Sequence, residues 1–465
     1  YYVNENTKDQ YPYLYEYLEQ FSYMKTNLTY AKNEIWFVPV KWSNDKSLYV
    51  RRDWIRNLNN KIDEILVADG VVSSASEITD DLRAEYRFSE EGPADLGEFY
   101  RLARAFTLYD PDGNNQNDTY GYVTEENRDM DSWLHVAYDS PWKMWVAGED
   151  GTYHNTATSD GSMLATSLLN KMIAEGYMSQ EVGIKTVGQK QDDFATGKAG
   201  MMYAHNWYNV ISANMMSANV ASSIPDARDK ILICDAPAGI NGNYGGQGDV
   251  YYYRGWCIRE GMSVERLQAC LNLMEFLHSP EGIELVTYGV YGEHWEWVND
   301  EVGGERVTLC EPDGQGFVQE LRWTDYAAFA SYLTYTPPEA KALLTNGDIL
   351  VARDSATAAT MIVSDYPDLY TDSMIRYQAG AYDYFDETVL TMITNSSLTA
   401  NWEFDAKTWK TDWKEKMYSV SDAMRTAWND FVSQYMDIYY GSIMEQEYNE
   451  AVQSGNMVKV GKMPE

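Results

Sequence analysis

The chain has 465 residues, enough for two compact domains, because single hydrophobic cores stop growing at about 250 to 300 residues. Its 71 acidic and 36 basic residues give a formal charge of -35, which excludes nucleic acid and anionic lipid surfaces as partners because both repel it. The four cysteines lack metal-type spacing, and no apolar run reaches the length of a membrane helix.

Helical and strand-like segments alternate along the chain and predict an α/β fold. A helix-like segment covers residues 11–21, and the stretch from 402 to 448 is expected to be mainly helical. Short β-like runs flanked by turn residues occur at residues 34–38, 47–50, 231–234 and 250–253.

Start signals mark the clearest helices. Asp95 and Glu98 form a variant capping box before an apolar stripe at helical spacing, which predicts a helix over residues 95–107. A second apolar stripe covers residues 267–277. Residues 279–281 follow it with an N-cap serine, a first-turn proline and an acidic first turn, so a further helix is expected there.

The sharpest local motif is DPDGNNQND at residues 110–118. Oxygen-bearing side chains at alternate positions of a turn-prone loop can point at one centre, as a hard cation such as calcium requires. The loop departs from a true EF-hand, since its sixth position is Asn115 instead of Gly and its twelfth is Gly121 instead of Glu. A solvated Asx-rich turn is the alternative interpretation. The candidate ligands are Asp110, Asp112, Asn114, Asp118 and the backbone carbonyl of Gln116.

The segment YGVYGEHWEW at residues 288–297 combines two tryptophans, two tyrosines, a histidine and two glycines, a composition suited to stacking on flat ligands. Catalytic patterns are weak by comparison. The five histidines show no zinc spacing, and no serine lies in a nucleophile elbow. A carboxylate pair for glycoside hydrolysis could be named in any chain this acidic, so naming one carries almost no information.

The segment FATGKAGMMYAHNW at residues 194–207 resembles the F-x-x-G-K-A-A-M segment of the extracellular solute-binding proteins of sugar ABC importers. Further similar segments follow the same order along the chain: LYVRRDWI at 48–55, parts of 98–121, and parts of 281–295. Together they resemble the large lipoprotein-type oligosaccharide-binding branch that includes the aldouronate-binding proteins. The resemblance runs across most of the chain.

This resemblance implies a type II periplasmic-binding-protein fold, in which two α/β lobes joined by several crossovers close on a sugar in an interlobe cleft, with a helical C-terminal region. Lobe 1 is expected to comprise residues 1–44 and 250–337, and lobe 2 residues 45–249 and 338–465. The crossovers are expected near residues 38–48, 245–252 and 337. Because family members begin with a lipidated signal peptide and further first-lobe elements, lobe 1 is expected to be incomplete in this chain.

Sugar sites combine aromatic platforms with planar amides and carboxylates. The resemblance places Trp207 at the cleft as the first stacking platform, and Trp42, which follows Pro39 in the first expected crossover, is a second. Packing in the core or in a loop is the alternative role for each residue. Further ligand contacts are expected at the second crossover and in the aromatic segment, from Tyr252, Trp256, Tyr291, His294 and Trp295.

The function that the resemblance implies is a non-enzymatic receptor that captures an oligosaccharide and delivers it to the permease subunits of an ABC importer. Such a receptor is extracellular and is held on the surface of a bacterium by a lipid anchor, which is expected to lie outside this chain. The family commonly carries a structural calcium ion where residues 110–118 lie. A glycoside-processing enzyme and a calcium-stabilised surface adhesin are the alternatives.

Overall fold

The computed structural model describes residues 3–20, 38–41, 46–126, 131–205, 227–245, 252–259, 261–298, 306–309 and 369–454. The chain divides into two compact units. Unit 1 comprises Tyr1–Asn44 and Gly248–Ala358, and unit 2 comprises Asp45–Gln247 and Ala359–Glu465. Within the described ranges, no helix combines the length and the apolar character needed to span a bilayer.

Unit 1 combines helices with small antiparallel sheets, in which β1 pairs with β8 and β9 pairs with β10. Its elements are α1 (Pro12–Gln20), β1 (Val38–Lys41), β8 (Tyr252–Trp256), α13 (Val264–His278), α14 (Pro280–Tyr288), β9 (Trp295–Trp297) and β10 (Arg306–Thr308). Leu14 of α1 packs against Leu271 and Met274 of α13. The Glu275 carboxylate of α13 accepts hydrogen bonds from the backbone N–H groups of Tyr13 (3.0 Å) and Leu14 (2.9 Å), and it thereby satisfies donors that the first turn of α1 leaves open.

Unit 2 is built around a four-stranded sheet in the order β3-β6-β2-β7, where β3 and β6 are parallel and β2 is antiparallel to both of its neighbours. Its elements up to β7 are β2 (Lys46–Arg51), α3 (Arg52–Asn60), α4 (Ile62–Ala68), α5 (Asp80–Tyr86), α6 (Leu96–Leu108), β3 (Tyr120–Val123), α7 (Ser132–Ala137), β4 (Trp145–Ala147), β5 (Tyr153–Asn155), α8 (Asp160–Ala174), α9 (Val187–Ala195), β6 (Ala199–His205), α12 (Ala227–Lys230) and β7 (Ile231–Cys234). The C-terminal helices are α19 (Asp372–Thr394), α20 (Trp409–Met417), α21 (Asp422–Asp437) and α22 (Gly441–Ser454).

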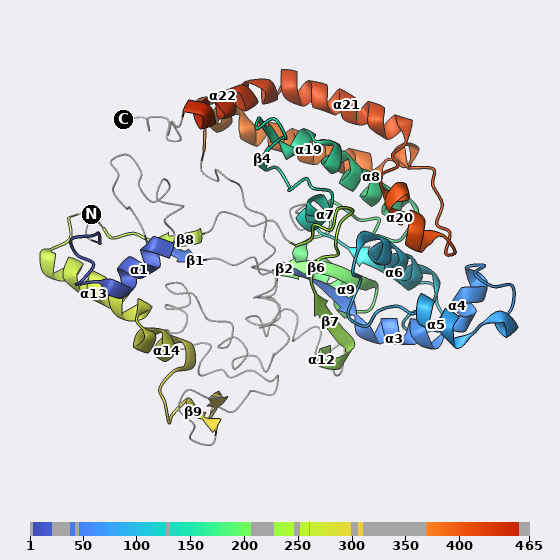
Figure 1. Ribbon diagram of the computed structural model, residues 1–465, viewed down its shortest axis with the longest axis horizontal. Coiled ribbons are helices and arrows are strands. Elements are labelled where there is room, and N and C mark those ends of the chain that lie inside the picture. The colour runs from blue at the N-terminus through green and yellow to red at the C-terminus, as the bar shows by residue number, and fades with distance from the viewer. Residues whose placement is uncertain are drawn as a thin grey trace. The chain divides into compact units, whose positions relative to one another are not determined.

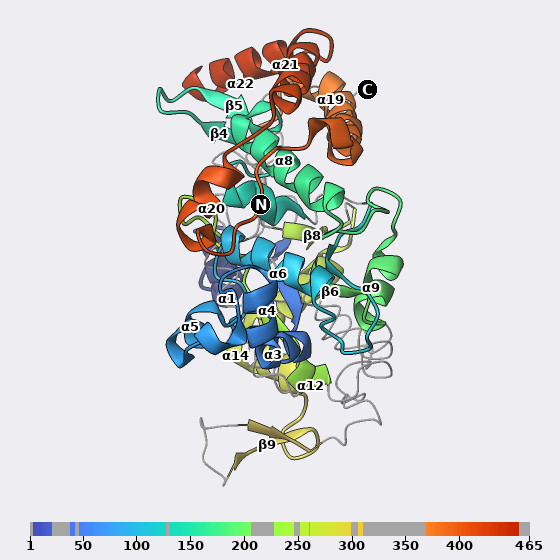
Figure 2. The same ribbon diagram turned by 90° about the vertical axis from the view of Figure 1, so that its right-hand side faces the viewer.

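Helices cover both faces of this sheet. Because successive side chains of a strand point to opposite faces, Leu48 and Val50 of β2 join the core that contains Phe106 of α6, whereas Tyr49 joins the core that contains Phe194 of α9. Figures 1 and 2 show α6 and α9 beside β6. A sheet buried on both faces explains the nearly continuous apolar runs of its strands.

The C-terminal helices form a further layer of unit 2. Helix α19 packs against α8, α21 and α22, as Figure 1 shows. The β4–β5 ribbon lies beside α22 (Figure 2), where the rings of Trp145 and Tyr448 stack with their centroids 4.4 Å apart. The mainly helical C-terminal stretch predicted from the sequence is therefore confirmed.

The helix start signals act as the sequence predicts. The Asp95 carboxylate accepts the Glu98 N–H at 2.8 Å, and the Glu98 carboxylate accepts the N–H of Ala94 at 2.8 Å, one residue earlier than in a regular capping box. The hydroxyl oxygen of Ser279 accepts the N–H of Gly282 at 3.1 Å and caps α14. Helix α6 differs from the predicted range by one residue at each end.

Three of the four predicted strands occur, as β2, β7 and β8. The predicted strand at residues 34–38 lies outside the described residues except for Val38, which begins β1.

Candidate functional site

The GKAG motif at residues 197–200 joins α9 to β6 and builds the scaffold of unit 2. Phe194 is 0% exposed, and Gly197 has a φ of +79°, a left-handed conformation that favours glycine at a helix end. At Gly200 an added Cβ would lie 2.1 Å from Cδ2 of Phe106. The ring of Phe106 therefore explains why this chain has Gly where the motif that it resembles has a second Ala.

A cavity of about 430 Å³ lies at the amino ends of β3 and β6, on unit 2. Its walls come from the loop before β3, the turn after α8 and the connection from α9 to β6. Polar side chains line much of it, among them Asp118, Tyr120, Gln180, Glu181, Asp193 and Lys198.

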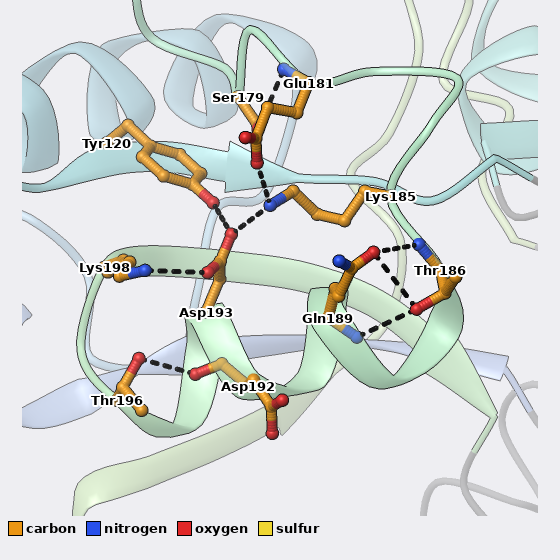
Figure 3. A network of polar contacts seen from close by, with 10 residues as sticks. All are labelled: Tyr120, Ser179, Glu181, Lys185, Thr186, Gln189, Asp192, Asp193, Thr196 and Lys198. Carbon is orange, nitrogen blue, oxygen red and sulfur yellow. Dashed lines mark hydrogen bonds and ion pairs between the residues drawn. The ribbon is translucent and has the colours of Figure 1, made fainter.

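Asp193 is the centre of a polar network in one wall of this cavity (Figure 3). Its Oδ2 accepts hydrogen bonds from Lys185 Nζ (2.6 Å) and from the Tyr120 hydroxyl (2.6 Å), and Lys198 Nζ lies 3.5 Å from Oδ1. Lys185 also pairs with Glu181 at 2.7 Å. Burial alone would raise the pKa of Asp193, but the hydrogen bonds from Lys185 and Tyr120 outweigh it and hold the pKa below its usual range. The network ties α9 to β3 and to the turn after α8.

The oxygen-rich loop at residues 110–118 joins α6 to β3. Positive φ angles turn its backbone at Asp110 (45°), Gly113 (75°) and Asn115 (60°). Lys61, between α3 and α4, donates from Nζ to the Asp110 carbonyl at 2.8 Å and to Oδ2 of the same residue at 3.2 Å. The loop is therefore anchored at its first residue by an ammonium group.

The predicted ligands Asp112 and Asp118 converge on one point. Asn114 Nδ2 donates to Oδ2 of Asp112 at 2.9 Å and to both carboxylate oxygens of Asp118 at 3.2 Å. Rotation of the Asn114 amide would place its oxygen beside these carboxylates and make a set of oxygen donors. Gln116 is exposed, and its backbone N–H donates to the present Asn114 oxygen at 2.7 Å.

The charges of the loop are not balanced by its described neighbours. For Asp112, burial and then the nearby carboxylates of Asp110 and Asp118 raise the pKa above its ordinary value. For Asp110, burial would also raise the pKa, but the hydrogen bond from Lys61 helps to hold it below the ordinary value. A bound cation would relieve this crowding. Among the residues that the structure describes, no group of three or more His, Cys, Asp or Glu could hold a metal, so an ion here would need Asn114 and a backbone oxygen as well.

The aromatic segment of unit 1 forms the turn between α14 and β9. Trp295 is 2% exposed, and its Nε1 donates to the Gly289 carbonyl at 3.2 Å. Its ring meets those of Tyr291 (5.1 Å) and Trp297 (5.0 Å) edge-on. Trp295 is thus enclosed by its own turn in this conformation.

The other two predicted residues of this segment differ in exposure. Nδ1 of His294 accepts the backbone N–H of Val290 at 2.9 Å and so helps to close the turn. Tyr291 is 53% exposed. The structure therefore brings Tyr291, His294 and Trp295 together, and of these Tyr291 has the most accessible ring.

The remaining predicted ligand residues lie on β8 or beyond the described residues. Tyr252 and Trp256 are the first and last residues of β8, opposite Lys41 and Val38 of β1. The half-buried Trp256 packs against the core between α1 and α13. Trp207 and Trp42, the two predicted stacking platforms, fall outside the described residues, as does the crossover expected near residue 337.

Sequence reasoning missed the network around Asp193. Asp193 gave no local signal, because adjacent residues of a helix point in different directions and the buried Phe194 beside it does not place it on the buried face. The partners Lys185 and Tyr120 could not be named, since no local spacing links them to that acid.

No protein-family model matches the chain. Lipoprotein LipO of Bacillus subtilis is 24% identical over 218 residues, which cover 44% of this chain and 41% of LipO. The polygalacturonan/rhamnogalacturonan-binding protein YtcQ of the same organism is 21% identical over 284 residues, or 59% of this chain and 48% of YtcQ. The matched parts span less than half the length of either relative.

Solved structures match over most of the chain. The substrate-binding protein FusA of a Streptococcus pneumoniae ABC transporter, in complex with kestose, has a TM-score of 0.56 at 16% identity and covers 97% of this chain and 83% of its own. Its EF-hand mutant in complex with fructo-nystose has a TM-score of 0.53 at 15% identity, with coverages of 97% and 83%. An alginate-binding protein solved without calcium ion has a TM-score of 0.55 at 13% identity, with coverages of 96% and 80%.

The fold is accordingly that of the periplasmic-type solute-binding proteins, as the motifs predicted. These three solved structures are named as binding proteins. The resemblance of this chain to the carbohydrate solute-binding proteins of ABC transporters is confirmed by both kinds of comparison.

Proposed function

We propose that this chain is the extracellular receptor of an ABC importer, which captures an oligosaccharide and delivers it to the permease. The observation that carries the proposal is the fold match over 97% of the chain to a transporter protein with kestose bound. In proteins with this fold, two lobes close around the ligand. Ligand binding shifts the equilibrium from the open to the closed state, and no covalent bond is made or broken. The lobes in the proposal are residues 1–44 with 250–337 and residues 45–249 with 338–465. A lipid anchor would hold the receptor at the cell surface, and one relative is named a lipoprotein.

Aromatic residues carry the ligand contacts in this proposal. Trp207 and Trp42 are the stacking platforms, because a pyranose ring offers an apolar C–H face to a flat ring. In the aromatic segment, the exposed Tyr291 supplies the platform, whereas His294 and Trp295 hold the turn that presents it. Tyr252 and Trp256 are proposed as contacts from β8.

Saccharide binding is tested by thermal unfolding with kestose, chitotriose and trigalacturonate, which are neutral, amino-sugar and uronic probes. One of them at tenfold excess over its Kd should add about 1.4 kcal/mol to the free energy of unfolding and raise the Tm by roughly 1 to 2 °C. Trp207→Ala should remove the shift. Tyr418→Ala, which removes an exposed ring after α20, is the control and should keep it.

No shift with any of the three probes would contradict the proposal and favour an adhesin. Release of shorter sugars during the assay would instead indicate a glycoside-processing enzyme.

We further propose that calcium is a structural ion of the loop at residues 110–118. Its ligands would be Asp110, Asp112, Asn114, Asp118 and the Gln116 carbonyl. The convergence of Asp112 and Asp118 on the Asn114 amide supports this assignment, because hard oxygen donors aimed at one point suit calcium. When bound, the ion would supply positive charge that neutralises the loop.

Calcium binding predicts a metal-dependent stability. Addition of calcium at tenfold excess over its Kd to chelator-treated protein should stabilise it by about 1.4 kcal/mol, and Asp112→Asn with Asp118→Asn should abolish this gain. Asp150→Asn, in an exposed turn before β5, is the matched control and should leave it unchanged. Thermal unfolding with calcium, with magnesium and with chelator measures the effect. An equal gain in the double variant would show that any calcium binds elsewhere.

A further inference from the structure

The loop that follows β7 in unit 2 is held on the end of α7 by one carboxylate. Asp139, two residues after α7, accepts hydrogen bonds from the side-chain amides of Asn241 and Asn243, one at each carboxylate oxygen. An ionised carboxylate only accepts, so the amide nitrogens face it. The backbones also meet closely, because an added Cβ at Gly239 would lie 1.8 Å from the Ala137 carbonyl oxygen. We call the three side chains that meet here the Asp139 clamp.

The clamp is exposed to solvent, although the backbone of its loop is well anchored. All three of its residues are exposed. The N–H of Gly239 donates to the Asn243 carbonyl at 2.7 Å, and that of Gly242 donates to the Gly239 carbonyl at 3.0 Å. Lys414 of α20 donates from Nζ to the Ile240 carbonyl at 2.9 Å. Water therefore reaches the clamp, whereas opening of the loop requires several hydrogen bonds to break together.

Asn241 is followed by glycine, which makes its side-chain amide chemically labile. Gly242 has no Cβ, so in an open loop its backbone nitrogen can approach Cγ of Asn241. After losing its proton, that nitrogen attacks Cγ, a ring N–Cγ bond forms, the Cγ–Nδ2 bond breaks, and the amide leaves as ammonia with a proton from water. Water then opens the succinimide ring. Attack at Cγ gives aspartate, and attack at the main-chain carbonyl carbon gives isoaspartate, so water is the only co-reactant.

In the closed loop two contacts oppose this attack. The Gly242 N–H donates to the Gly239 carbonyl, so the nucleophilic nitrogen keeps its proton. The Asp139 carboxylate holds Nδ2 of Asn241, so Cγ is not free to turn toward Gly242. The reaction therefore proceeds from the locally opened loop, and the clamp determines how often that loop opens.

We propose that Asn241 is a deamidation site whose rate is set by the Asp139 clamp. The product carries a carboxylate at position 241 that faces the Asp139 carboxylate, where like charges repel and neither group can donate a hydrogen bond. Loss of the amide thus converts an attraction into a repulsion and releases the loop from the end of α7. The inference does not depend on the proposed receptor function.

The first test follows each amide by peptide mass spectrometry while the whole chain is incubated at mildly alkaline pH. Asp139→Gly removes the clamp without strain, because glycine favours the positive φ of 56° at this position. Deamidation of Asn241 should become about tenfold faster, since two hydrogen bonds to a charged group are lost from an exposed loop. Asn243 shares the clamp but precedes Tyr244, whose Cβ hinders the attack, so it should stay intact in both proteins.

The matched control is Asn346–Gly347, the same pair of residues in a part of the chain outside the described ranges. Its rate should be equal in the wild type and in Asp139→Gly. An unchanged rate at Asn241, including no reaction in either protein, would overturn the inference. A slower rate would also overturn it, because Asp139 would then promote the reaction. Loss of the amide at Asn243 as fast as at Asn241 would show that the following glycine does not matter.

The second test concerns release of the loop. The N–H of Ile240 donates to the Ala137 carbonyl at 3.3 Å, so its hydrogen exchange reports whether the loop is docked on α7. Asn241→Asp reproduces the product, and Asn241→Ser removes the amide without adding a charge. Exchange at Ile240 should be about fivefold faster in Asn241→Asp than in Asn241→Ser, as expected for two like charges in contact through water. Equal exchange in these two variants would contradict release by charge repulsion.

Discussion

Lys185→Met should destabilise unit 2 by about 3 kcal/mol, because it leaves the buried Asp193 carboxylate without its nearest counter-charge. The side chains of Lys185 and Asp193 are only 5% and 10% exposed, so water compensates for the lost ammonium group only in part. The Tyr120 hydroxyl still donates to the carboxylate, which limits the loss. Urea unfolding followed by tryptophan fluorescence measures it as a lower midpoint at constant m-value.

Lys198→Met is the matched control, since it makes the same substitution beside the same carboxylate. Lys198 is 63% exposed and 3.5 Å from Asp193, so its loss should change the free energy of unfolding by less than about 0.5 kcal/mol. Equal effects of the two substitutions would mean that burial does not determine the strength of this ion pair.

The same network predicts a pH dependence with a definite sign. Folding lowers the pKa of Asp193, so the ionised carboxylate stabilises the folded state. This contribution to the free energy of unfolding is complete above the carboxyl pKa of the unfolded chain, about 3.9, and is lost as the pH falls through the lower pKa of the folded state. The Asp193→Asn variant should therefore be less stable than the wild type at pH 7. The difference between their free energies of unfolding should become smaller below about pH 4. Parallel urea titrations across this range measure it. A difference that grows toward low pH would contradict the assigned direction.

Gly200→Ala should cost about 3 kcal/mol, at the upper end of the range for overpacked cores. The added Cβ would lie 2.1 Å from a ring carbon of Phe106, a side chain that is 0% exposed on α6. Relief would require α6 to move away from β6. The measurement is again the urea midpoint, with the far-ultraviolet circular dichroism spectrum showing that the fold is kept.

A second substitution that restores stability would show that the loss comes from the steric clash, and not from a requirement for glycine in the strand itself. Phe106→Leu removes the ring that meets the new Cβ, so Gly200→Ala should cost clearly less in that background, and the coupling between the two sites should be about 1 kcal/mol or more. Gly188→Ala is the control, because Gly188 lies in α9 with nothing within 4 Å of an added Cβ, and it should be neutral or slightly stabilising. If the free-energy changes of Gly200→Ala and Phe106→Leu simply added in the double variant, the steric explanation would be contradicted.

Local sequence patterns were sufficient to predict many of the helices and strands and to detect the resemblance to sugar-binding proteins. Asp95 and Ser279 predicted helix starts correctly, because a capping side chain bonds to a backbone group only three residues away. The order of motifs along the chain predicted the fold class, since a motif such as residues 194–200 encodes a helix end, a left-handed glycine and a strand start together. The calcium ligand set at residues 110–118 stays a prediction, although the structure brings Asp112 and Asp118 to the same Asn114 amide.

Only the tertiary structure decided which distant groups meet. Asp193 and Lys190 lie on one short helix, yet their partners Tyr120 and Glu125 come from β3 and the chain after it, and no spacing in the sequence links them. Exposure was decided in the same way, because the turn that buries Trp295 leaves Tyr291 accessible although both are aromatic residues of one segment. The sequence by itself determined helix caps, turns and strand runs because these depend on residues within one or two turns of each other. Ion pairs, burial and the need for Gly200 depend on how whole elements pack, which no local pattern contains.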